Sequence, residues 1–427
     1  MDNFTPVNGA LHAEGVALST IADKVGTPVY VYSTAAFQHH ARTFREGLTG
    51  AGVTRIHLAY AIKANPNLAV LRVLANEGYG ADVVSGGEMM RALAGGMPAK
   101  DIVFSGVGKT REEMTAALDA GIGQFNLELE EEGEVLAALA HARGLRAPAT
   151  LRVNPDVDAG THAKISTGRK ENKFGVPIDQ AVEMYGRLAE LDGLSLHGIA
   201  IHIGSQLLDL APLEAAYTRI GALIAELRKF GHFITRVDLG GGLGVVYKDG
   251  DVPPSAAEYG AMVARVTKDW DVELMFEPGR LIVANAGVLL TKVIWVKPGA
   301  INPYVIVDAA MNDLARPALY DAWHDFAAVR PDGKRMIANI AGPVCESGDT
   351  FAMGRDIDAV HSGDLAVFHS AGAYGATMAS TYNSRALVPE VLVDGDRFAV
   401  VADRIQPETI LAAERLPEWL KADKVAG

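Results

Sequence analysis

Between Ile56 and Glu277, short apolar runs alternate with segments in which apolar residues recur every three or four positions. Short apolar runs bounded by turn residues are typical of buried strands, and the second pattern is typical of helices with one apolar face. We therefore expect eight strands joined by seven helices. The predicted strands are Ile56–Ile62, Ala81–Val84, Ile102–Ser105, Gly123–Leu127, Ala149–Asn154, Leu194–His202, Arg236–Leu239 and Glu273–Glu277. The predicted helices are Leu68–Asn76, Glu88–Ala94, Arg111–Asp119, Glu130–Arg143, Gln180–Leu191, Leu213–Phe230 and Ala256–Asp269.

Strict alternation of strand and helix with this count predicts an α/β fold, a (β/α)8 barrel of the TIM type. A doubly wound open sheet is the structural alternative. Beyond Leu281 the helical spacing fades, and short β-rich runs separated by turns predict a second, mostly β domain that begins near Asn285. These runs are Val288–Val296, Tyr304–Val307, Lys334–Ile340, Asp364–Phe368, Glu390–Val393 and Phe398–Ala402, and a short helix at Leu18–Val25 and a strand at Pro28–Tyr32 precede the barrel.

Composition and charge narrow the classes of partner. The 427 residues are 49% hydrophobic and 21% charged, as in a globular protein long enough for two domains. The net charge of -13 argues against nucleic acid or an anionic membrane surface, so a small anionic ligand would need a local basic pocket. The single cysteine, Cys345, excludes an internal disulfide and a multi-cysteine metal site. No secretory signal or membrane-spanning run is recognised, so we expect a cytoplasmic protein.

Polar or glycine residues gather just past nearly every predicted strand, where barrels of this type carry their chemistry. Lys63 ends the first strand, and a solvated surface lysine is the simpler interpretation of it. If Lys63 lies in a pocket, desolvation lowers its pKa and makes the amine a nucleophile for a carbonyl. The residues after the other strands are Asp82, Ser105 and Lys109, Asn126 and Glu128, Arg152 and Asn154, His202 and Ser205, Gly240 to Gly242, and Glu277 to Arg280.

The glycine cluster after the seventh strand is a candidate phosphate site. The backbone N–H groups of Gly240, Gly241 and Gly242 could approach phosphate oxygens closely, although a tight turn is the alternative. A phosphate site opposite a reactive lysine suggests pyridoxal phosphate, bound covalently by Lys63.

Three further residues can be given roles around this cofactor. His202 could stack on its pyridine ring, or it is a buried core histidine. Ser205 could reach the phosphate. Glu277 could keep the ring nitrogen protonated, which makes the ring an electron sink, or it caps the turn before Pro278.

Together, several segments resemble the alanine-racemase-like (fold type III) family of pyridoxal phosphate enzymes, and the similarity runs from about Thr27 to about Leu416. It is greatest to the branch that decarboxylates meso-2,6-diaminopimelate to L-lysine and CO2, the last step of lysine biosynthesis. The resemblance implies that Lys63 carries the cofactor and that Asp82, Gly279 and Arg280 help to bind it. It also implies a barrel at 33–285 and a β domain built from 1–32 and 286–427. The segments are Tyr60–Asn65, Asp82–Glu88, His202–Gln206, Gly240–Gly244 and Glu277–Arg280.

The second domain carries further segments that resemble this family. Asp308–Tyr320 matches its substrate-binding segment, with Arg316 and Tyr320 at the corresponding places. Gly342–Asp349 matches its catalytic loop, which implies that Cys345 returns a proton to the α-carbon and that Glu346 binds substrate. The resemblance implies that this loop reaches the barrel of a partner subunit, which makes a homodimer with two shared sites. Gly372–Gly375 matches a later signature, in which Tyr374 contacts both cofactor and substrate.

The residues expected at the far end of the substrate favour diaminopimelate. Arg280 and Arg316 with Glu346 supply the cation and the anion that a distal amino-acid group requires, whereas ornithine or arginine would need only acidic groups. Another decarboxylase or racemase of this fold, and a binding protein without catalysis, are the competing interpretations, as is an inert thiol at Cys345. The loop Asp156–Val176 is either a plain connection or a mobile lid.

Overall fold

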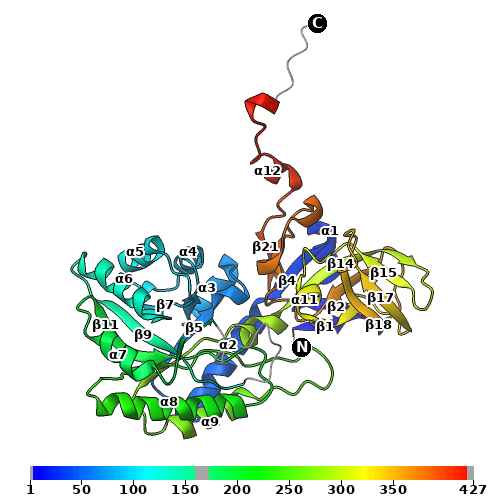
Figure 1. Cartoon of the computed structure of the whole chain (residues 1–427). Helices are drawn as coiled ribbons and strands as arrows, with labels where there is room; N and C mark the ends of the chain where they lie inside the picture. The colour runs from blue at the N-terminus through cyan, green and yellow to red at the C-terminus, as the bar shows by residue number, and fades with distance from the viewer. Residues whose placement is uncertain (1–2, 159–172, 421–427) are drawn as a thin grey trace.

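The computed structural model describes residues 3–158 and 173–420, and it contains a closed barrel of eight parallel strands (Figure 1). Each barrel strand pairs with the next, and the last pairs back with the first, where Leu274 lies opposite Ile56. This closure confirms the predicted barrel and rules out the open sheet. The strands are β5 (Ile56–Ala61), β6 (Gly80–Val83), β7 (Ile102–Phe104), β8 (Gln124–Leu127), β9 (Ala147–Asn154), β11 (Leu194–Ala200), β12 (Arg236–Asp238) and β13 (Glu273–Phe276).

All seven predicted barrel helices form, with ends that differ from the predicted ones by at most a few residues. They cover the outside of the barrel, where their apolar faces pack on the strands (Figure 1). They are α3 (Leu68–Asn76), α4 (Gly86–Gly95), α5 (Arg111–Ala120), α6 (Glu130–His141), α7 (Ala181–Ala189), α8 (Ala211–Lys229) and α9 (Ala256–Thr267), and a short α10 (Arg280–Val283) follows β13.

One long helix, α2 (Thr34–Gly50), has no counterpart in the sequence prediction. The Ser33 side chain accepts a hydrogen bond from the Ala36 backbone and so caps its start. Phe37, Phe44 and Leu48 are buried on one face, and the helix packs beside α9. Their spacing of seven and four residues is the amphipathic signal that could have identified α2 from the sequence.

A second, mostly β domain follows the barrel. Its main sheet has the strand order β18-β17-β15-β14-β4-β20-β21. β4 lies inside it between β14 and β20, so an N-terminal strand completes a sheet made largely by the C-terminal part of the chain. The fold class is therefore as predicted, although β16 and β18 and the small sheet β1–β3 were missed. The boundaries 33–285 and 1–32 with 286–427 stay a prediction. The strands are β1 (Phe4–Val7), β2 (Ala10–Ala13), β3 (Val16–Ala17), β4 (Val29–Ser33), β14 (Gly287–Lys297), β15 (Tyr304–Val307), β16 (Phe326–Ala328), β17 (Arg335–Ala341), β18 (Thr350–Asp358), β19 (Leu365–Phe368), β20 (Glu390–Asp394) and β21 (Arg397–Ala402).

The second sheet is tied to the barrel at the turn that carries Lys63. β5 ends in a 3-10 turn, Ile62–Ala64, and the Tyr374 backbone N–H donates to the Ala64 carbonyl at 2.8 Å. The Asn65 side chain donates to the Gly372 carbonyl at 3.1 Å. The loop after β19 therefore closes over the carboxyl end of the first barrel strand.

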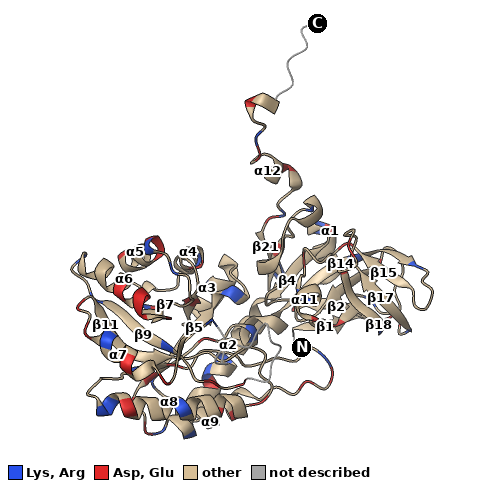
Figure 2. Ribbon diagram, in the orientation of Figure 1, with Lys and Arg blue, Asp and Glu red and all other residues tan. Residues whose placement is uncertain are grey.

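Basic and acidic residues both lie along the outer helices of the barrel (Figure 2). Arg187 on α7 pairs with Glu130 on α6 at 2.6 Å, and Arg265 on α9 pairs with Glu214 on α8 at 2.7 Å. Such exposed pairs contribute little to stability, so the apolar faces of the helices hold the outer layer in place. Within residues 3–158 and 173–420, no helix has the length and apolar character needed to cross a membrane.

Candidate active site

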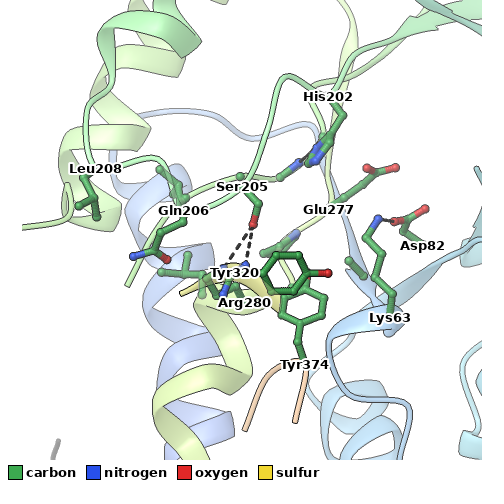
Figure 3. A pocket seen from close by; sticks show the side chains of 18 of the residues that line it. Lys63, Asp82, His202, Ser205, Gln206, Leu208, Glu277, Arg280, Tyr320 and Tyr374 are labelled. Carbon is green, nitrogen blue, oxygen red and sulfur yellow. Dashed lines mark hydrogen bonds and ion pairs between the residues drawn. The ribbon is translucent and has the colours of Figure 1, made fainter. Parts of the chain in front are cut away.

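A cavity of about 1050 Å³ opens at the carboxyl ends of the barrel strands and extends to the second domain. Figure 3 shows side chains from both parts of the chain converging on it. The structure brings most of the predicted site residues together here, and two, Cys345 and Glu346, do not line the cavity. The predicted residues that line it are Lys63, Asp82, His202, Ser205, Gly240, Gly241, Gly242, Glu277, Gly279, Arg280, Arg316, Tyr320 and Tyr374.

Lys63 projects from the end of β5 toward Asp82 at the end of β6 (Figure 3). Its Nζ lies 3.2 Å from Asp82 Oδ2, and 39% of its side chain is exposed to the cavity. Burial lowers the pKa of Lys63, but Asp82, Tyr374 and Glu277 together outweigh this effect and raise the pKa above its ordinary value. The expected lowering by desolvation is therefore wrong for this chain without a ligand, because the lysine sits among acidic groups.

Glu277, at the end of β13, forms a coupled pair with Asp238, at the end of β12. Asp238 is fully buried and accepts hydrogen bonds from the Gly240 backbone at 2.9 Å and from Asn126 at 3.0 Å. Burial first, and then the charges of Asp238 and Asp82, raise the pKa of Glu277 well above its ordinary value. Glu277 therefore keeps a proton and donates it to Asp238. The sequence analysis assigned no role to Asp238, because only the pairing of β12 with β13 brings it beside Glu277.

The glycine loop after β12 is held close to the neighbouring strands. A Cβ atom at Gly241 would lie 2.2 Å from the Glu277 carbonyl oxygen, and Gly242 adopts a φ of +119° that other residues rarely accept. The Gly240 N–H already donates to Asp238, and the Gly241 N–H donates to His202 Nδ1 at 3.3 Å. The glycines are thus required by close packing, and the N–H groups of Gly240 and Gly241 point to protein acceptors rather than to a phosphate.

His202 ends in the cavity as a neutral ring. Burial, and then the charges of Lys63 and Arg152, lower the pKa of His202 well below its ordinary value. A neutral imidazole that accepts from the Gly241 backbone presents a flat face without a positive charge. This state suits stacking against an aromatic ring.

Arg280, at the start of α10, is buried among neutral partners. It donates to Ser205 Oγ at 3.2 and 3.3 Å (Figure 3) and to Tyr247 Oη at 2.7 Å. Its guanidinium carbon also lies 4.8 Å from the centre of the Tyr374 ring. Within the described residues no carboxylate lies within ion-pair distance of Arg280, so its charge is available to an anion. Tyr247 is a site residue that no sequence motif indicated.

Arg316 begins α11 (Arg316–Tyr320) and reaches the same cavity from the second domain. Tyr30 of β4 donates to the Asp313 carbonyl at 2.6 Å, and this bond ties the segment before α11 to the middle of the β sheet. Arg316 is 7% exposed, and its guanidinium carbon lies 4.6 Å from the centre of the Tyr247 ring. Two buried arginines from different domains therefore face one cavity.

The loop that carries Cys345 and Glu346 is well organised but lies outside this cavity. The Asp349 carboxylate accepts from the Val344 backbone at 2.7 Å and from the Met311 backbone at 2.6 Å, which ties the loop to the segment before α11. Cys345 is exposed, and Glu346 accepts a hydrogen bond from Tyr382 at 2.7 Å. Neither side chain meets Lys63 within the same chain, so their roles stay predictions.

Two other polar groups that follow barrel strands have structural partners. Lys109 Nζ lies 2.7 Å from Glu132, and Arg152 lies 2.7 Å from Glu128 in a second largely buried pair. Because their charges are neutralised by carboxylates of the protein, these cations stabilise the loops and are not available to bind an anionic ligand. The loop Asp156–Val176, expected to be either a plain connection or a lid, lies mostly outside the described residues, since 159–172, including Thr161–Lys164, are not described.

The cavity fits pyridoxal phosphate. Among the described residues, Glu277 Oε1 is buried without a hydrogen-bond partner, as is Asp82 Oδ1. An unpartnered buried oxygen is costly, and a ring nitrogen that shares a proton with Glu277 would satisfy it. Arg280 and Ser205 offer donors to a phosphate on the side of the cavity away from Glu277 (Figure 3).

Comparison with known proteins gives consistent matches over almost the whole chain. Residues 34–284 match the family model "Pyridoxal-dependent decarboxylase, pyridoxal binding domain". The chain is 53% identical to a diaminopimelate decarboxylase of Zymomonas mobilis, over 98% of this chain and 99% of that protein. It is 51% identical to one of Pseudomonas aeruginosa, over 97% and 99%. The crystal structure of a diaminopimelate decarboxylase from M. jannaschii in complex with L-lysine superimposes with a TM-score of 0.93, at 35% identity over 98% of this chain and 99% of that one.

Proposed function

This chain belongs to the pyridoxal-dependent decarboxylases, and from that membership we propose that it removes one carboxylate of meso-diaminopimelate as CO2 and releases L-lysine, the last step of lysine biosynthesis. Relatives at 51 and 53% identity over nearly their full length are diaminopimelate decarboxylases. The single observation in this structure that best supports the substrate is the pair of buried arginines, Arg280 and Arg316, that face Lys63 across one cavity. The cytoplasm stays the predicted compartment.

The charges in the cavity favour a substrate with two carboxylates over one with a single carboxylate and a cationic far end, such as ornithine or arginine. A decarboxylase for ornithine or arginine must bind a substrate whose far end is a cation, and a second buried arginine would repel that cation. In this chain Arg316 has no carboxylate within ion-pair distance among the described residues, so it can pair with a carboxylate at that end. A racemase of the same fold needs no such group.

The cofactor would be held by residues from most of the barrel mouth. When bound, pyridoxal phosphate supplies an electron sink for the electron pair left on the α-carbon when CO2 departs. Lys63 would hold it covalently, His202 would cover its ring, and Glu277 would pair with its ring nitrogen. Ser205, Gly279, Arg280 and Tyr374 would hold its phosphate. The loop Gly240, Gly241 and Gly242 would lie beside the cofactor, but the N–H groups of Gly240 and Gly241 already donate within the protein.

Proton positions in the free site prepare these residues for their roles. Lys63 carries a proton that Asp82 stabilises at 3.2 Å, so Asp82 fixes the direction of the amine and can take up that proton. Glu277 carries a proton on a carboxyl group whose pKa burial and Asp238 raise. Because that proton is donated to Asp238, Oε1 of Glu277, which has no partner among the described residues, would accept a hydrogen bond from a protonated ring nitrogen and so strengthen the electron sink.

The thiol and the acidic group are proposed to come from a second subunit. Cys345 is exposed, and among the described residues the Glu346 side chain is hydrogen-bonded to the exposed Tyr382 alone, although both sit in a loop that Asp349 holds in shape. In a homodimer, the partner's copy of this loop would enter the cavity, where the thiol of Cys345 returns a proton to the α-carbon. Glu346 would then bind the distal amine beside Arg316 and Tyr320.

The test of the proposed function is CO2 release from meso-diaminopimelate by the purified protein, with and without added pyridoxal phosphate. L-lysine should form in equal amount, and release should depend on the cofactor. Ornithine and arginine serve as matched alternative substrates. Faster release from either of them than from diaminopimelate would contradict the proposed substrate, and no release from any would contradict decarboxylation.

The shared site has a separate test by complementation. Lys63→Ala and Glu346→Ala chains are each expected to be inactive, but a mixed dimer has one site with both lesions and one site with none. Activity should therefore return to a fraction of the wild-type value after the subunits exchange. If verified mixed dimers remain inactive, each site is built from one chain and the homodimer assignment of Cys345 and Glu346 is wrong.

A further inference from the structure

His324 lies behind Arg316, in the segment between α11 and β16, and no part of the proposed function uses it. Its side chain is 2% exposed and does not line the cavity. The ring packs edge-on against Tyr247, at 5.6 Å between ring centres and 82° between planes. The Arg355 side chain donates to the His324 backbone carbonyl, so main chain and ring are both held in place.

The partners of the ring determine which nitrogen carries the proton. Nδ1 lies 2.8 Å from the backbone carbonyl oxygen of His369, and a carbonyl can only accept, so Nδ1 bears the hydrogen. Nε2 therefore has a free lone pair, and it lies 2.8 Å from Arg316 Nη1, which can only donate. Burial and the charge of Arg316 lower the pKa of His324 to about 3, so the ring stays neutral at ordinary pH.

Arg316 has neutral partners, as does Arg280, another buried arginine of the cavity, and in this both differ from two further cations. Lys109 and Arg152, which follow barrel strands and are also largely buried, each pair with a carboxylate at 2.7 Å. Those pairs are neutral overall and have little attraction left for an anion. Arg316 is held equally closely, but by a partner without charge, so its positive charge is not cancelled.

We propose that His324 is a positioning and specificity-determining residue: it orients Arg316 through a neutral acceptor and so leaves the guanidinium charge available to the carboxylate at the far end of the substrate. This inference rests on the proposed function, in which Arg316 receives that carboxylate. His324 touches neither substrate nor cofactor, and its effect passes through Arg316.

The experiment compares two variants of nearly equal size, His324→Gln and His324→Glu. Glutamine can still accept from Arg316 without charge, whereas glutamate adds the carboxylate that this position lacks. The readout is competitive inhibition by L-lysine, which keeps one carboxylate, and by cadaverine, the same diamine without it. The visible absorbance of the cofactor bound to Lys63 shows whether each variant retains the cofactor.

Wild-type enzyme should bind L-lysine more tightly than cadaverine, and His324→Gln should keep this preference within about threefold. His324→Glu should reduce the preference at least tenfold, which corresponds to about 1.4 kcal/mol, through weaker binding of L-lysine. It should raise KM for diaminopimelate more than it lowers kcat, because the reacting end of the site is unchanged.

Arg316→Met is the reference variant, since it removes the charge itself. If Arg316→Met abolishes the preference for L-lysine but His324→Glu leaves it intact, the inference about His324 is overturned while the proposed function stands. If Arg316→Met also leaves the preference intact, the assigned distal site fails. Equal weakening of both inhibitors in His324→Gln and His324→Glu would mean a merely structural role and would overturn the inference.

Discussion

Three carboxylates, those of Asp82, Asp238 and Glu277, lie at the end of the barrel, and the positive charge of Lys63 offsets part of the rise in the pKa of Glu277. The substitution Glu277→Gln tests how the closeness of these carboxylates affects the stability of the protein. Glutamine has the size of the protonated glutamic acid, and its amide can donate to Asp238 as the carboxyl group does. The substitution should therefore change the free energy of unfolding little at low pH, where Glu277 carries its proton.

The difference should appear as the pH rises. The pKa values of Glu277 and Asp238 are both raised by burial, so folding requires the pair to keep a proton that the unfolded chain loses above about pH 4. The stability from that proton is fully present at low pH and is lost as the pH rises toward the folded pKa values. One proton corresponds to about 1.4 kcal/mol per pH unit. Glu277→Gln should remove this loss, because Asp238 then faces an amide instead of a second acid.

The assay is urea unfolding of the cofactor-free protein between pH 5.5 and 7.5. Across that range the stability of Glu277→Gln should rise relative to wild type, by up to about 1.4 kcal/mol for each pH unit below the folded pKa of Glu277. Buried histidines such as His202 and His324 titrate alike in both proteins and cancel in the difference. Parallel stability profiles for the two proteins would refute the reasoning. In the cofactor-bound enzyme the same change should lower kcat by about 100-fold or more, because the ring nitrogen loses its acidic partner.

Other substitutions test single parts of the site. Lys63→Ala should abolish turnover and the visible absorbance of the lysine-bound cofactor while the barrel stays folded, and a chromophore on a second lysine would refute the assignment. Cys345→Ala should lose most turnover but keep that absorbance, whereas near-normal turnover would show that another group returns the proton. Gly241→Ala should lower stability by about 1–3 kcal/mol and weaken cofactor binding in an equilibrium titration, because the new methyl group meets the Glu277 carbonyl at 2.2 Å. Unchanged affinity would show that the glycine loop does not touch the cofactor.

The sequence by itself determined the architecture and most of the cavity lining. Strand and helix periodicity is local, and so is the rule that chemistry follows the carboxyl ends of barrel strands. Lys63 and Glu277 could therefore be placed at one face of a barrel before any tertiary contact was known. The helix α2 was missed although its apolar spacing carries the same local signal.

The tertiary structure alone decided how the charges in the site are balanced. Arg152 and Arg316 look alike in the sequence, yet one pairs with Glu128 and the other with a neutral His324. The tautomer of His324 depends on the carbonyl of His369, 45 positions away, which only the folded β domain brings within hydrogen-bond distance. Likewise, the proton on Glu277 depends on a buried Asp238 from the neighbouring strand. Sequence patterns report local periodicity. The pKa values and the hydrogen-bond partners of these side chains depend instead on burial and on distances between residues far apart in the sequence, which only the folded chain sets.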